Sequence, residues 1–295
     1  AFPLPEKPSI AVLPFTNMSE YSKQEFFSDG ITEEIITALS KTPDLFVIAR
    51  NSSFTYKGKS VNVQQVAEEL GVLYVLEGSV RKAGDNLRIT AQLVDAISGK
   101  HLWGERYDRE LKEIFSLQDE ITMKILSALQ VKLTIGEQAR TMAKGTDNLE
   151  AYLKILQARA LKWDFTIEHL PLMRQLAEEA ISLDPKYAAA YNFLSGCYRF
   201  EVWYGLTKTP GKSLERSFEI VQKALALDEN LAAAYSSLGS YYNMKRQFDK
   251  AITNIELAIS LNPNDADNHA NFGRFLNNLG RTDESIAEFK KAIRL

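Results

Sequence analysis

A short sequence motif recurs at a fixed spacing in the C-terminal half of the chain. Alanine, an aliphatic residue, any residue and leucine stand together at Ala224–Leu227, Ala258–Leu261 and Ala292–Leu295, and these segments begin 34 residues apart. A similar segment begins at Ala180, 44 residues before the first of them, which equals one period plus an insertion of ten. Periods of this length are typical of stacked helix pairs, in which no unit buries its hydrophobic face alone. The spacing therefore predicts an all-α repeat array.

The segments between these motifs carry the same side-chain types at equivalent places. A large ring comes first, then a large apolar residue, a small residue and another large one. These sets are Tyr191, Tyr235 and His269; Leu194, Leu238 and Phe272; Ser195, Gly239 and Gly273; and Tyr198, Tyr242 and Leu276. The order resembles the tetratricopeptide repeat. Small residues such as Gly239, Gly273 and Ala251 are expected to let paired helices approach closely.

The resemblance implies an all-α tetratricopeptide-repeat solenoid over residues 148–295. We expect an irregular first unit over about 148–186, then three regular repeats, the last of them truncated. Stacked helix pairs leave a groove that is lined by side chains of the first helices. The residues expected to line this partner-binding groove are Asn192, Arg199, Ser236, Ser240, Asn243, Arg274 and Asn277. The alternative is that these polar side chains simply face solvent.

Some tetratricopeptide proteins hold a C-terminal carboxylate with a clamp of Lys, Asn and Arg side chains. The clamp is absent here, because the corresponding positions are Asn192, Gly196, Ser236, Ser240 and Ala270. The resemblance therefore implies a protein or peptide partner of another class. A homodimer of the chain stays open as an alternative, because the sequence does not determine the oligomeric state.

The N-terminal half alternates between strand-like and helix-like segments. The β-branched run at residues 9–15 predicts a buried strand, and residues 45–49 predict a second. Between them, Asp29 is expected to cap a helix whose first turn carries two glutamates, which the helix dipole favours. A short helix is predicted over residues 63–70, ended by Gly71.

A β-hairpin is expected next. Residues 72–82 and 87–95 are its strands, and the turn at residues 83–86 contains the Gly and Asn that tight turns need. Apolar and polar residues alternate along the return strand, as in a half-buried antiparallel strand. A third strand at residues 100–107 and an amphipathic helix at about 112–134 follow.

Long stretches of this half resemble the TolB-like N-terminal domain. They are residues 8–15, 27–34, 45–54, 74–81, 88–93 and 101–108. We assign residues 9–136 to this domain, with an α/β fold of a mixed sheet and helices, and the proline-rich residues 1–8 to a linker. The pair of a TolB-like domain and tetratricopeptide repeats is similar to the C-terminal part of two kinds of bacterial signalling protein. These are class III adenylate/guanylate cyclases and membrane-tethered CadC-type transcription activators.

In such proteins the output domain usually comes first, often followed by one membrane helix and then by this pair. The resemblance implies a periplasmic region of a membrane-tethered protein, with a cytoplasmic location as the alternative. The chain begins without methionine and stops inside a helical pattern, so we expect a piece of a longer protein. Its apolar runs are shorter than the ~18 residues of a membrane span, so we expect no membrane contact by this piece itself.

The charge distribution bears on the class of partner. The formal net charge is −3, which argues against a nucleic-acid partner. The first domain has a local group of cations that we interpret as a solvated face: Arg50, Lys57, Lys59, Arg81, Lys82 and Arg88. Arg50, Asn51 and Ser52 end a predicted strand, where α/β folds often bind ligands, and a small-ligand site there is a further hypothesis.

We predict no catalytic residue, no metal site and no cofactor. Residues 205–213 look like a phosphate-binding loop, but five residues instead of four separate the glycines, and Pro210 lacks a backbone donor. A turn and a helix start are expected there instead. The three histidines are far apart in the sequence, and Cys197, the single cysteine, is expected to be a buried apolar side chain. Asp29 has no second carboxylate placed for the paired metals of a nucleotidyl transferase.

The sequence thus predicts a non-catalytic sensory and protein-interaction region of a bacterial signalling protein. An adenylate/guanylate cyclase is the preferred parent, because residues 5–15 are most similar to the linker junction of that group. Enzymatic activity would then belong to the rest of the parent. The alternatives are an envelope assembly scaffold and the sensor region of a CadC-type activator.

Overall fold

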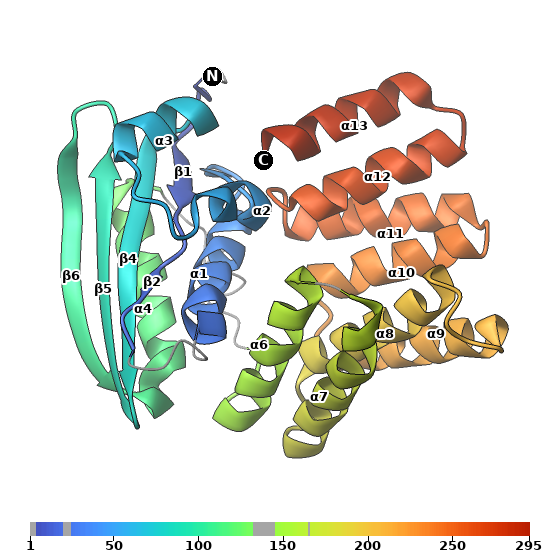
Figure 1. Ribbon diagram of the computed structural model, residues 1–295. Coiled ribbons are helices and arrows are strands. Elements are labelled where there is room, and N and C mark those ends of the chain that lie inside the picture. The colour runs from blue at the N-terminus through green and yellow to red at the C-terminus, as the bar shows by residue number, and fades with distance from the viewer. Residues whose placement is uncertain (1–3, 20–24, 132–144, 165) are drawn as a thin grey trace. The chain divides into compact units, whose positions relative to one another are not determined.

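The computed structural model describes residues 4–19, 25–131, 145–164 and 166–295. The chain divides into two compact units, one from its N-terminal part and one from the helices that begin at residue 149. Figure 1 shows the elements of both units.

The first unit is built on a six-stranded mixed sheet. Its strands are β1 Ser9–Val12, β2 Thr16–Asn17, β3 Phe46–Val47, β4 Tyr74–Ala83, β5 Asn86–Asp95 and β6 Lys100–Glu110. The order is β3-β1-β4-β5-β6, and β2 also pairs with β4. β1 lies parallel to both of its neighbours, whereas the β4–β5 and β5–β6 pairs are antiparallel. The α/β fold with a mixed sheet that the sequence predicts is confirmed.

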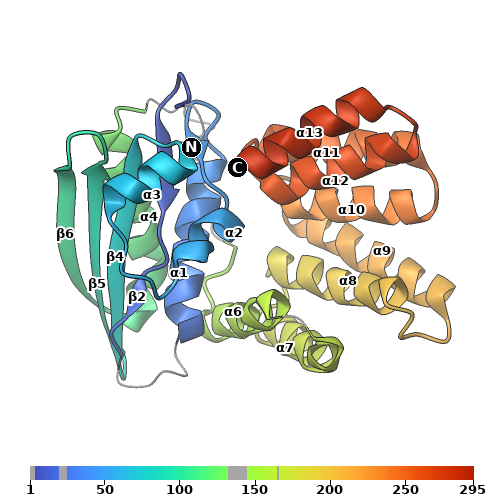
Figure 2. The same ribbon diagram turned by 45° about the horizontal axis from the view of Figure 1, so that its top comes forward.

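Helices cover both faces of this sheet. They are α1 Glu25–Ser40, α2 Arg50–Ser53, α3 Val63–Leu70 and α4 Ile114–Ala128, with 3₁₀ turns η2 Phe54–Tyr56 and η3 Leu111–Glu113. Contacts join α1 to α4, and Figure 2 shows both behind the strands while α3 lies in front of them. On the α3 face, Val66 and Ala67 pack against Ala11 of β1 and Val75 of β4. The apolar stripe of each helix therefore buries one side of the sheet.

The prediction that Asp29 caps the first helix is wrong. α1 begins at Glu25, so Asp29 lies within the helix. Hydroxyls of this helix bond to preceding carbonyls, with Ser28 Oγ donating to Glu25 O at 3.0 Å and Thr32 Oγ1 to Ser28 O at 2.9 Å. Such back-bonding lets small polar residues stay in a helix interior. Polar residues before Asp29 therefore extend the helix rather than precede it.

Three element boundaries also differ from the prediction. The strand at residues 9–15 ends at Val12, and the strand at residues 45–49 is limited to β3. The helix expected over 112–134 begins as η3 and ends at Ala128, because Gln130 has a left-handed φ of 55°. Residues 132–134 and the connection up to residue 144 lie outside the described part of the chain.

The hairpin is confirmed, with a tighter turn than expected. Ala83 pairs directly with Asn86, so only Gly84 and Asp85 form the loop. Gly84 has φ of 59°, a conformation that two-residue hairpin loops require and that glycine adopts without strain. The third strand continues to Glu110, beyond the predicted residue 107.

The second unit is a succession of antiparallel helix pairs (Figure 1). Its helices are α6 Leu149–Trp163, α7 Leu170–Leu183, α8 Ala188–Trp203, α9 Pro210–Leu227, α10 Ala232–Met244, α11 Phe248–Leu261, α12 Ala266–Asn278 and α13 Thr282–Arg294, with a 3₁₀ turn η4 Ile167–His169 before α7. α6 and α7 form the irregular first unit. The following pairs are α8 with α9, α10 with α11, and α12 with α13.

Small residues permit close packing within these pairs, as predicted. A Cβ atom on Gly239 of α10 would lie 3.2 Å from Ala251 O of α11 and 3.1 Å from the ring of Phe275. A Cβ atom on Gly273 of α12 would lie 3.1 Å from Ser285 O and from the ring of Phe289. All four distances are shorter than ordinary van der Waals contact, so a larger residue at either glycine would push the helices apart.

The ten-residue insertion forms the turn and helix start that were predicted. α8 ends at Trp203, Gly205 adopts a φ of 66°, and α9 begins at Pro210, where proline is favoured at the first helical position. Ser213 N donates to Thr209 O at 3.1 Å as part of this helix. The segment does not have the strand-loop-helix geometry of a phosphate-binding loop.

Candidate functional site

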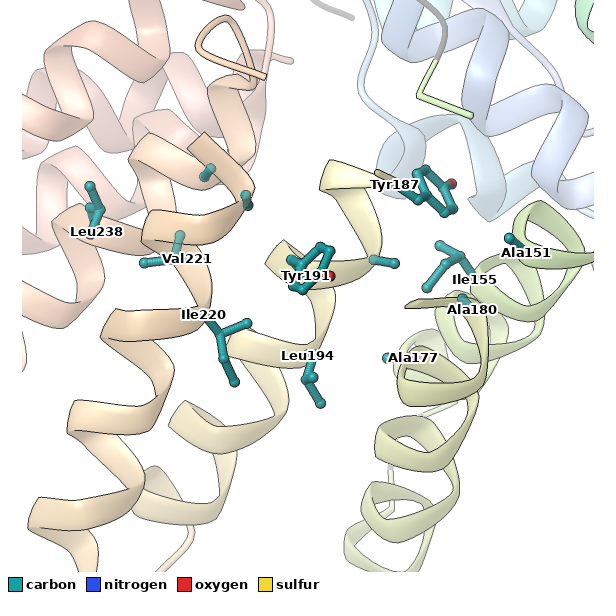
Figure 3. Close-up of a cluster of buried hydrophobic side chains, with 13 residues drawn as sticks. Ala151, Ile155, Ala177, Ala180, Tyr187, Tyr191, Leu194, Ile220, Val221 and Leu238 are labelled. Carbon is teal, nitrogen blue, oxygen red and sulfur yellow. The ribbon is translucent and has the colours of Figure 1, made fainter. Parts of the chain in front are cut away.

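The repeat unit contains a cavity of about 600 Å³ between α7, α8 and α9. Most of its lining surface is apolar, although half of the lining residues are charged or polar. The lining residues are Glu178, Ile181, Ser182, Tyr191, Leu194, Tyr198, Arg216, Glu219, Ile220 and Lys223. Figure 3 shows Tyr191, Leu194 and Ile220 within the cluster of buried side chains at α8 and α9. This cavity could not be predicted from the sequence, because these positions look like ordinary helix-packing residues.

Charged groups of this cavity already interact within the protein. Arg216 Nη1 lies 2.9 Å from Glu219 Oε2, and Lys223 Nζ lies 5.3 Å from the centre of the Tyr191 ring. The lining of the cavity therefore combines apolar side chains with charged groups that have partners within the protein. The cavity offers no nucleophile with an adjacent base among the described residues that line it.

The residues predicted to line the partner-binding groove lie elsewhere, on α8, α10 and α12. None of the seven is among the described residues that line the cavity. Hydrogen bonds connect these first helices, with Asn271 Nδ2 donating to Ser236 Oγ at 3.4 Å and Asn278 Nδ2 to Asn243 Oδ1 at 2.8 Å. We name the first-helix face as the predicted residues and their partners: Asn192, Arg199, Trp203, Ser236, Ser237, Ser240, Asn243, Asn271, Arg274, Asn277 and Asn278.

Arg199 of this face also connects three helices. Its Nη1 donates to Ser195 Oγ at 2.9 Å and to Ser217 Oγ of α9 at 3.3 Å, and its Nη2 donates to Ser237 Oγ of α10 at 2.9 Å. Burial lowers the pKa of Arg199 to about 10. The side chain still carries its charge at neutral pH, and serine hydroxyls accept its hydrogen bonds in place of a carboxylate. The prediction of a groove-lining arginine did not anticipate this packing role.

Arg274 on α12 is the second cation of the first-helix face. Its Nη2 donates to Asn271 Oδ1 at 2.8 Å. The guanidinium carbon lies 4.7 Å from the centre of the Trp203 ring and 5.5 Å from that of Phe275. Burial lowers the pKa of Arg274. Trp203 is 55% exposed, so this contact places an accessible aromatic ring beside a cation.

The structure corrects the predicted setting of Arg50, Asn51 and Ser52. They do not end a strand but lie in the short helix α2, which is separated from the end of β3 by two residues. Arg50 Nε lies 3.2 Å from Glu33 Oε2 of α1, and its guanidinium carbon is 3.8 Å from the centre of the Phe54 ring. These contacts already hold the Arg50 side chain. The small-ligand site at these residues stays a prediction.

A second ion pair lies on the same side of α1. Asp29 accepts a hydrogen bond from Lys57 Nζ at 2.7 Å, and Lys57 also contacts Glu25 at 3.0 Å. Burial raises the pKa of Asp29, although Lys57 pulls it in the opposite direction. Three of the six cations that were expected to form a solvated face are thus in ion pairs, Arg50, Lys57 and Arg88.

The remaining reactive residue types are separated in space or inert. Cys197 on α8 is buried, as predicted, and burial raises its pKa to about 12, so it stays a thiol at neutral pH. His269 Nδ1 lies 2.6 Å from Glu288 Oε2 in the last helix pair. Across the described residues, no group of three or more His, Cys, Asp or Glu side chains could hold a metal ion. No described helix is both long and apolar enough for a membrane span.

Comparison with protein families identifies both parts of the chain. Residues 6–124 match the family described as HilA/YgeH-like transcriptional regulator, second domain. Residues 232–265 and 266–295 each match the tetratricopeptide repeat, which confirms the repeat identification. A relative in Rhizobium meliloti (strain 1021), named "Putative adenylate cyclase 3", is 52% identical over 192 residues. The match covers 65% of this chain and 33% of that protein, so the chain spans about a third of the relative's length.

Solved structures with similarity to this chain include MamA, a tetratricopeptide protein and a TolB protein. MamA is 21% identical with a TM-score of 0.36, over 62% of this chain and 88% of that chain. A thermophilic tetratricopeptide protein from Thermus thermophilus is 17% identical with a TM-score of 0.41, over 61% and 85% of the two chains. TolB from Acinetobacter baumannii is 19% identical with a TM-score of 0.33, over 43% and 29%. Two family models thus match parts of this chain, the HilA/YgeH-like regulator second domain over residues 6–124 and the tetratricopeptide repeat over residues 232–265 and 266–295.

Proposed function

We propose that this chain is the sensory, protein-binding region of a bacterial signalling protein and that the repeat unit holds a protein or peptide partner on its first-helix face. The observation that carries the proposal is the repeat array itself, four helix pairs whose last two match the tetratricopeptide family. Solenoids of this kind present extended surfaces on which partner segments lie. Hydroxyls, amides and two arginines of successive first helices form such a surface here.

An adenylate or guanylate cyclase is the proposed parent. The relative from Rhizobium meliloti, whose name includes adenylate cyclase, supports this, since it shares 52% identity over 192 residues and is about three times as long as the matched part. In the proposed mechanism, a bound partner changes how this region associates and so sets the pairing of the output domains. The chain itself contributes binding and no turnover.

The test compares cyclic-nucleotide formation by the full-length parent and by this chain, each expressed in a bacterial strain that lacks its own adenylate cyclase. The proposal predicts cyclic AMP or cyclic GMP with the full-length protein and background levels with residues 1–295 alone. Removing the repeats from the full-length protein should change the rate at which it forms the cyclic nucleotide, but should not abolish that activity. Cyclic-nucleotide formation by the chain alone would contradict the proposal.

A second candidate is the sensor region of a transcription activator, which the match of residues 6–124 to HilA/YgeH-like regulators favours. In that case the full-length protein would change reporter transcription without making a cyclic nucleotide. The same expression experiment, with a promoter library in place of the nucleotide assay, separates the two parents. An envelope assembly scaffold would produce neither signal.

We further propose a periplasmic location for this region, on the basis of its resemblance to membrane-tethered signalling proteins. Alkaline phosphatase can be fused to the full-length parent directly after the residue that corresponds to Leu295 of this chain, and it should then be active. A green fluorescent protein fused at the same position should be dark. The opposite pair of results would place the region in the cytoplasm.

A further inference from the structure

Arg199, Trp203, Ser237, Asn271 and Arg274 form a connected group on the first-helix face, which we name the arginine cluster. Arg199 and Trp203 stand four residues apart on α8 and therefore share one side of that helix. Arg199 donates to Ser237 of α10, and Arg274 of α12 donates to Asn271 while its guanidinium lies over Trp203. Three successive first helices thus contribute to one cluster.

This cluster carries two positive charges and no described negative charge. Hydroxyl, amide and aromatic groups surround Arg199 and Arg274, and neither guanidinium lies within ion-pair distance of a carboxylate in the described residues. Two other arginines of the repeat unit differ: Arg216 pairs with Glu219 at 2.9 Å, and Arg281 pairs with Glu284 at 2.6 Å. The first-helix face therefore has positive charge that the described part of the protein leaves unbalanced.

Partly buried guanidinium groups without a counterion favour an anionic ligand, because a carboxylate relieves the cost of their desolvation. Arg274 is the better placed of the two. Its Nη2 bonds Asn271, and its Nη1 donates to no described residue, so this group can still form a charge-assisted hydrogen bond. The exposed ring of Trp203 provides an apolar surface next to it.

We infer that the partner segment held by the first-helix face is acidic, with an Asp or Glu carboxylate bound at Arg274 and its aliphatic part against Trp203. This inference rests on the proposed function and names the chemistry of its partner. It differs from the C-terminal carboxylate clamp, whose positions hold Asn192, Gly196, Ser236, Ser240 and Ala270. Nucleic acid is disfavoured, because a cluster of two arginines in a chain of net charge −3 lacks the extended cationic track that phosphates need.

The test measures fluorescence anisotropy of labelled hexaglutamate with the full chain, residues 1–295. Labelled hexaglutamine is the neutral comparison, and a six-nucleotide oligothymidylate tests the nucleic-acid alternative. Arg274→Gln removes the charge, Arg274→Lys keeps it, and Arg216→Gln removes an arginine of α9 that already has an ion pair. Thermal unfolding of each variant checks that the repeat unit stays folded.

We expect hexaglutamate to bind the wild type more tightly than hexaglutamine, and Arg274→Gln to weaken hexaglutamate binding about tenfold or more. Arg274→Lys should retain part of the affinity, Arg216→Gln all of it, and high salt should weaken binding. Equal affinity for the two peptides, no detectable hexaglutamate binding, unchanged affinity of folded Arg274→Gln, or tighter binding of the oligonucleotide would each overturn the inference.

Failure of this inference can be told apart from failure of the proposed function. Ser240→Trp places a bulky side chain on the first-helix face and should block any partner there, whatever its charge. A protein partner that Ser240→Trp loses but Arg274→Gln retains would preserve the proposed function and reject the acidic segment. A partner that both variants retain would reject the proposed function as well.

Discussion

Single residues determine where this chain tolerates change. Gly78 in the middle of β4 is such a position, because a Cβ atom there would meet Thr90 O of β5 and lie 2.8 Å from the ring of Phe15. Glu288 is another, a carboxylate that is nearly buried yet held by two donors, Lys291 Nζ at 2.8 Å and His269 Nδ1 at 2.6 Å. The residues that limit substitution at Gly78 are distant in the sequence, and one of the two donors to Glu288 lies on the facing helix.

Gly78→Ala should destabilise the first unit by roughly 1–3 kcal/mol, because the added methyl group meets backbone and a packed ring that cannot move away cheaply. Gly104→Ala on β6 is the matched control, since its Cβ atom would be 3.5 Å from its nearest neighbour, an ordinary contact. Urea unfolding followed by tryptophan fluorescence and circular dichroism measures both. Equal stability of the two variants would show that the β4–β5 contact is not as tight as described.

Glu288 predicts how the stability of the repeat unit depends on pH. Burial alone would raise the pKa of Glu288, but hydrogen bonds from Lys291 and His269 outweigh it, and the pKa lies below its usual value of 4.5. A carboxyl group with a lowered folded-state pKa contributes stability above its unfolded-state value, and this stability is lost as the pH falls through the folded-state value. Glu288→Gln should therefore flatten the loss of stability below about pH 4.5. The measurement is the free energy of unfolding of the wild type and of Glu288→Gln between about pH 7 and pH 3. Two parallel curves over this range would contradict the prediction.

Helices and strands show how far the sequence determines the fold. The repeat helices could be predicted because their side-chain pattern returns every 34 residues and the same small residues recur at the packing positions, as at Gly239 and Gly273. Boundaries were less predictable where polar residues continue a helix, as before Asp29, or where a strand is short, as in β3. These limits depend on contacts with distant segments, which local patterns do not contain.

In the candidate site too, local sequence patterns predict some features, whereas contacts between distant segments determine others. Sequence position alone identified Arg199 and Arg274 as first-helix residues, because repeat numbering places them. It could not predict that serines from three helices surround Arg199 or that Trp203 lies under Arg274. Those contacts join helices many residues apart. The available signal in the sequence was the tryptophan at position 203, since aromatic residues are enriched at protein interfaces.

At the level of elements, Asn148 should control the stability of the first helix pair. Its side chain caps α6 by accepting from Ala151 N at 3.0 Å, and its Nδ2 donates to Leu183 O at the end of α7 at 2.9 Å. Asn148→Ala should cost about 1–2 kcal/mol through the lost cap and the lost link. Asn148→Asp keeps the cap acceptor and should cost less. Hydrogen exchange of α6 amides measures both, and equal protection in the wild type and Asn148→Ala would contradict the account.

The chain combines an α/β unit with a repeat unit that has two distinct surfaces. One is the cavity between α7, α8 and α9, whose lining is largely apolar, and the other is the first-helix face, where hydroxyls, amides and two arginines predominate. The first-helix face is the more favourable surface for a partner, because it carries two arginines without a described counterion and extends over successive repeats. The proposed function depends on this choice.

Site-specific photocrosslinking in living bacteria tests that choice most directly. A p-benzoylphenylalanine placed at Ser240 of α10 reports on the first-helix face, and one placed at Glu219 of α9 reports on the cavity. Both are introduced into the full-length parent, and the adducts are compared with and without Arg274→Gln. The account predicts a defined protein adduct from Ser240 that Arg274→Gln abolishes, and none from Glu219. An adduct from Glu219 with none from Ser240 would contradict it.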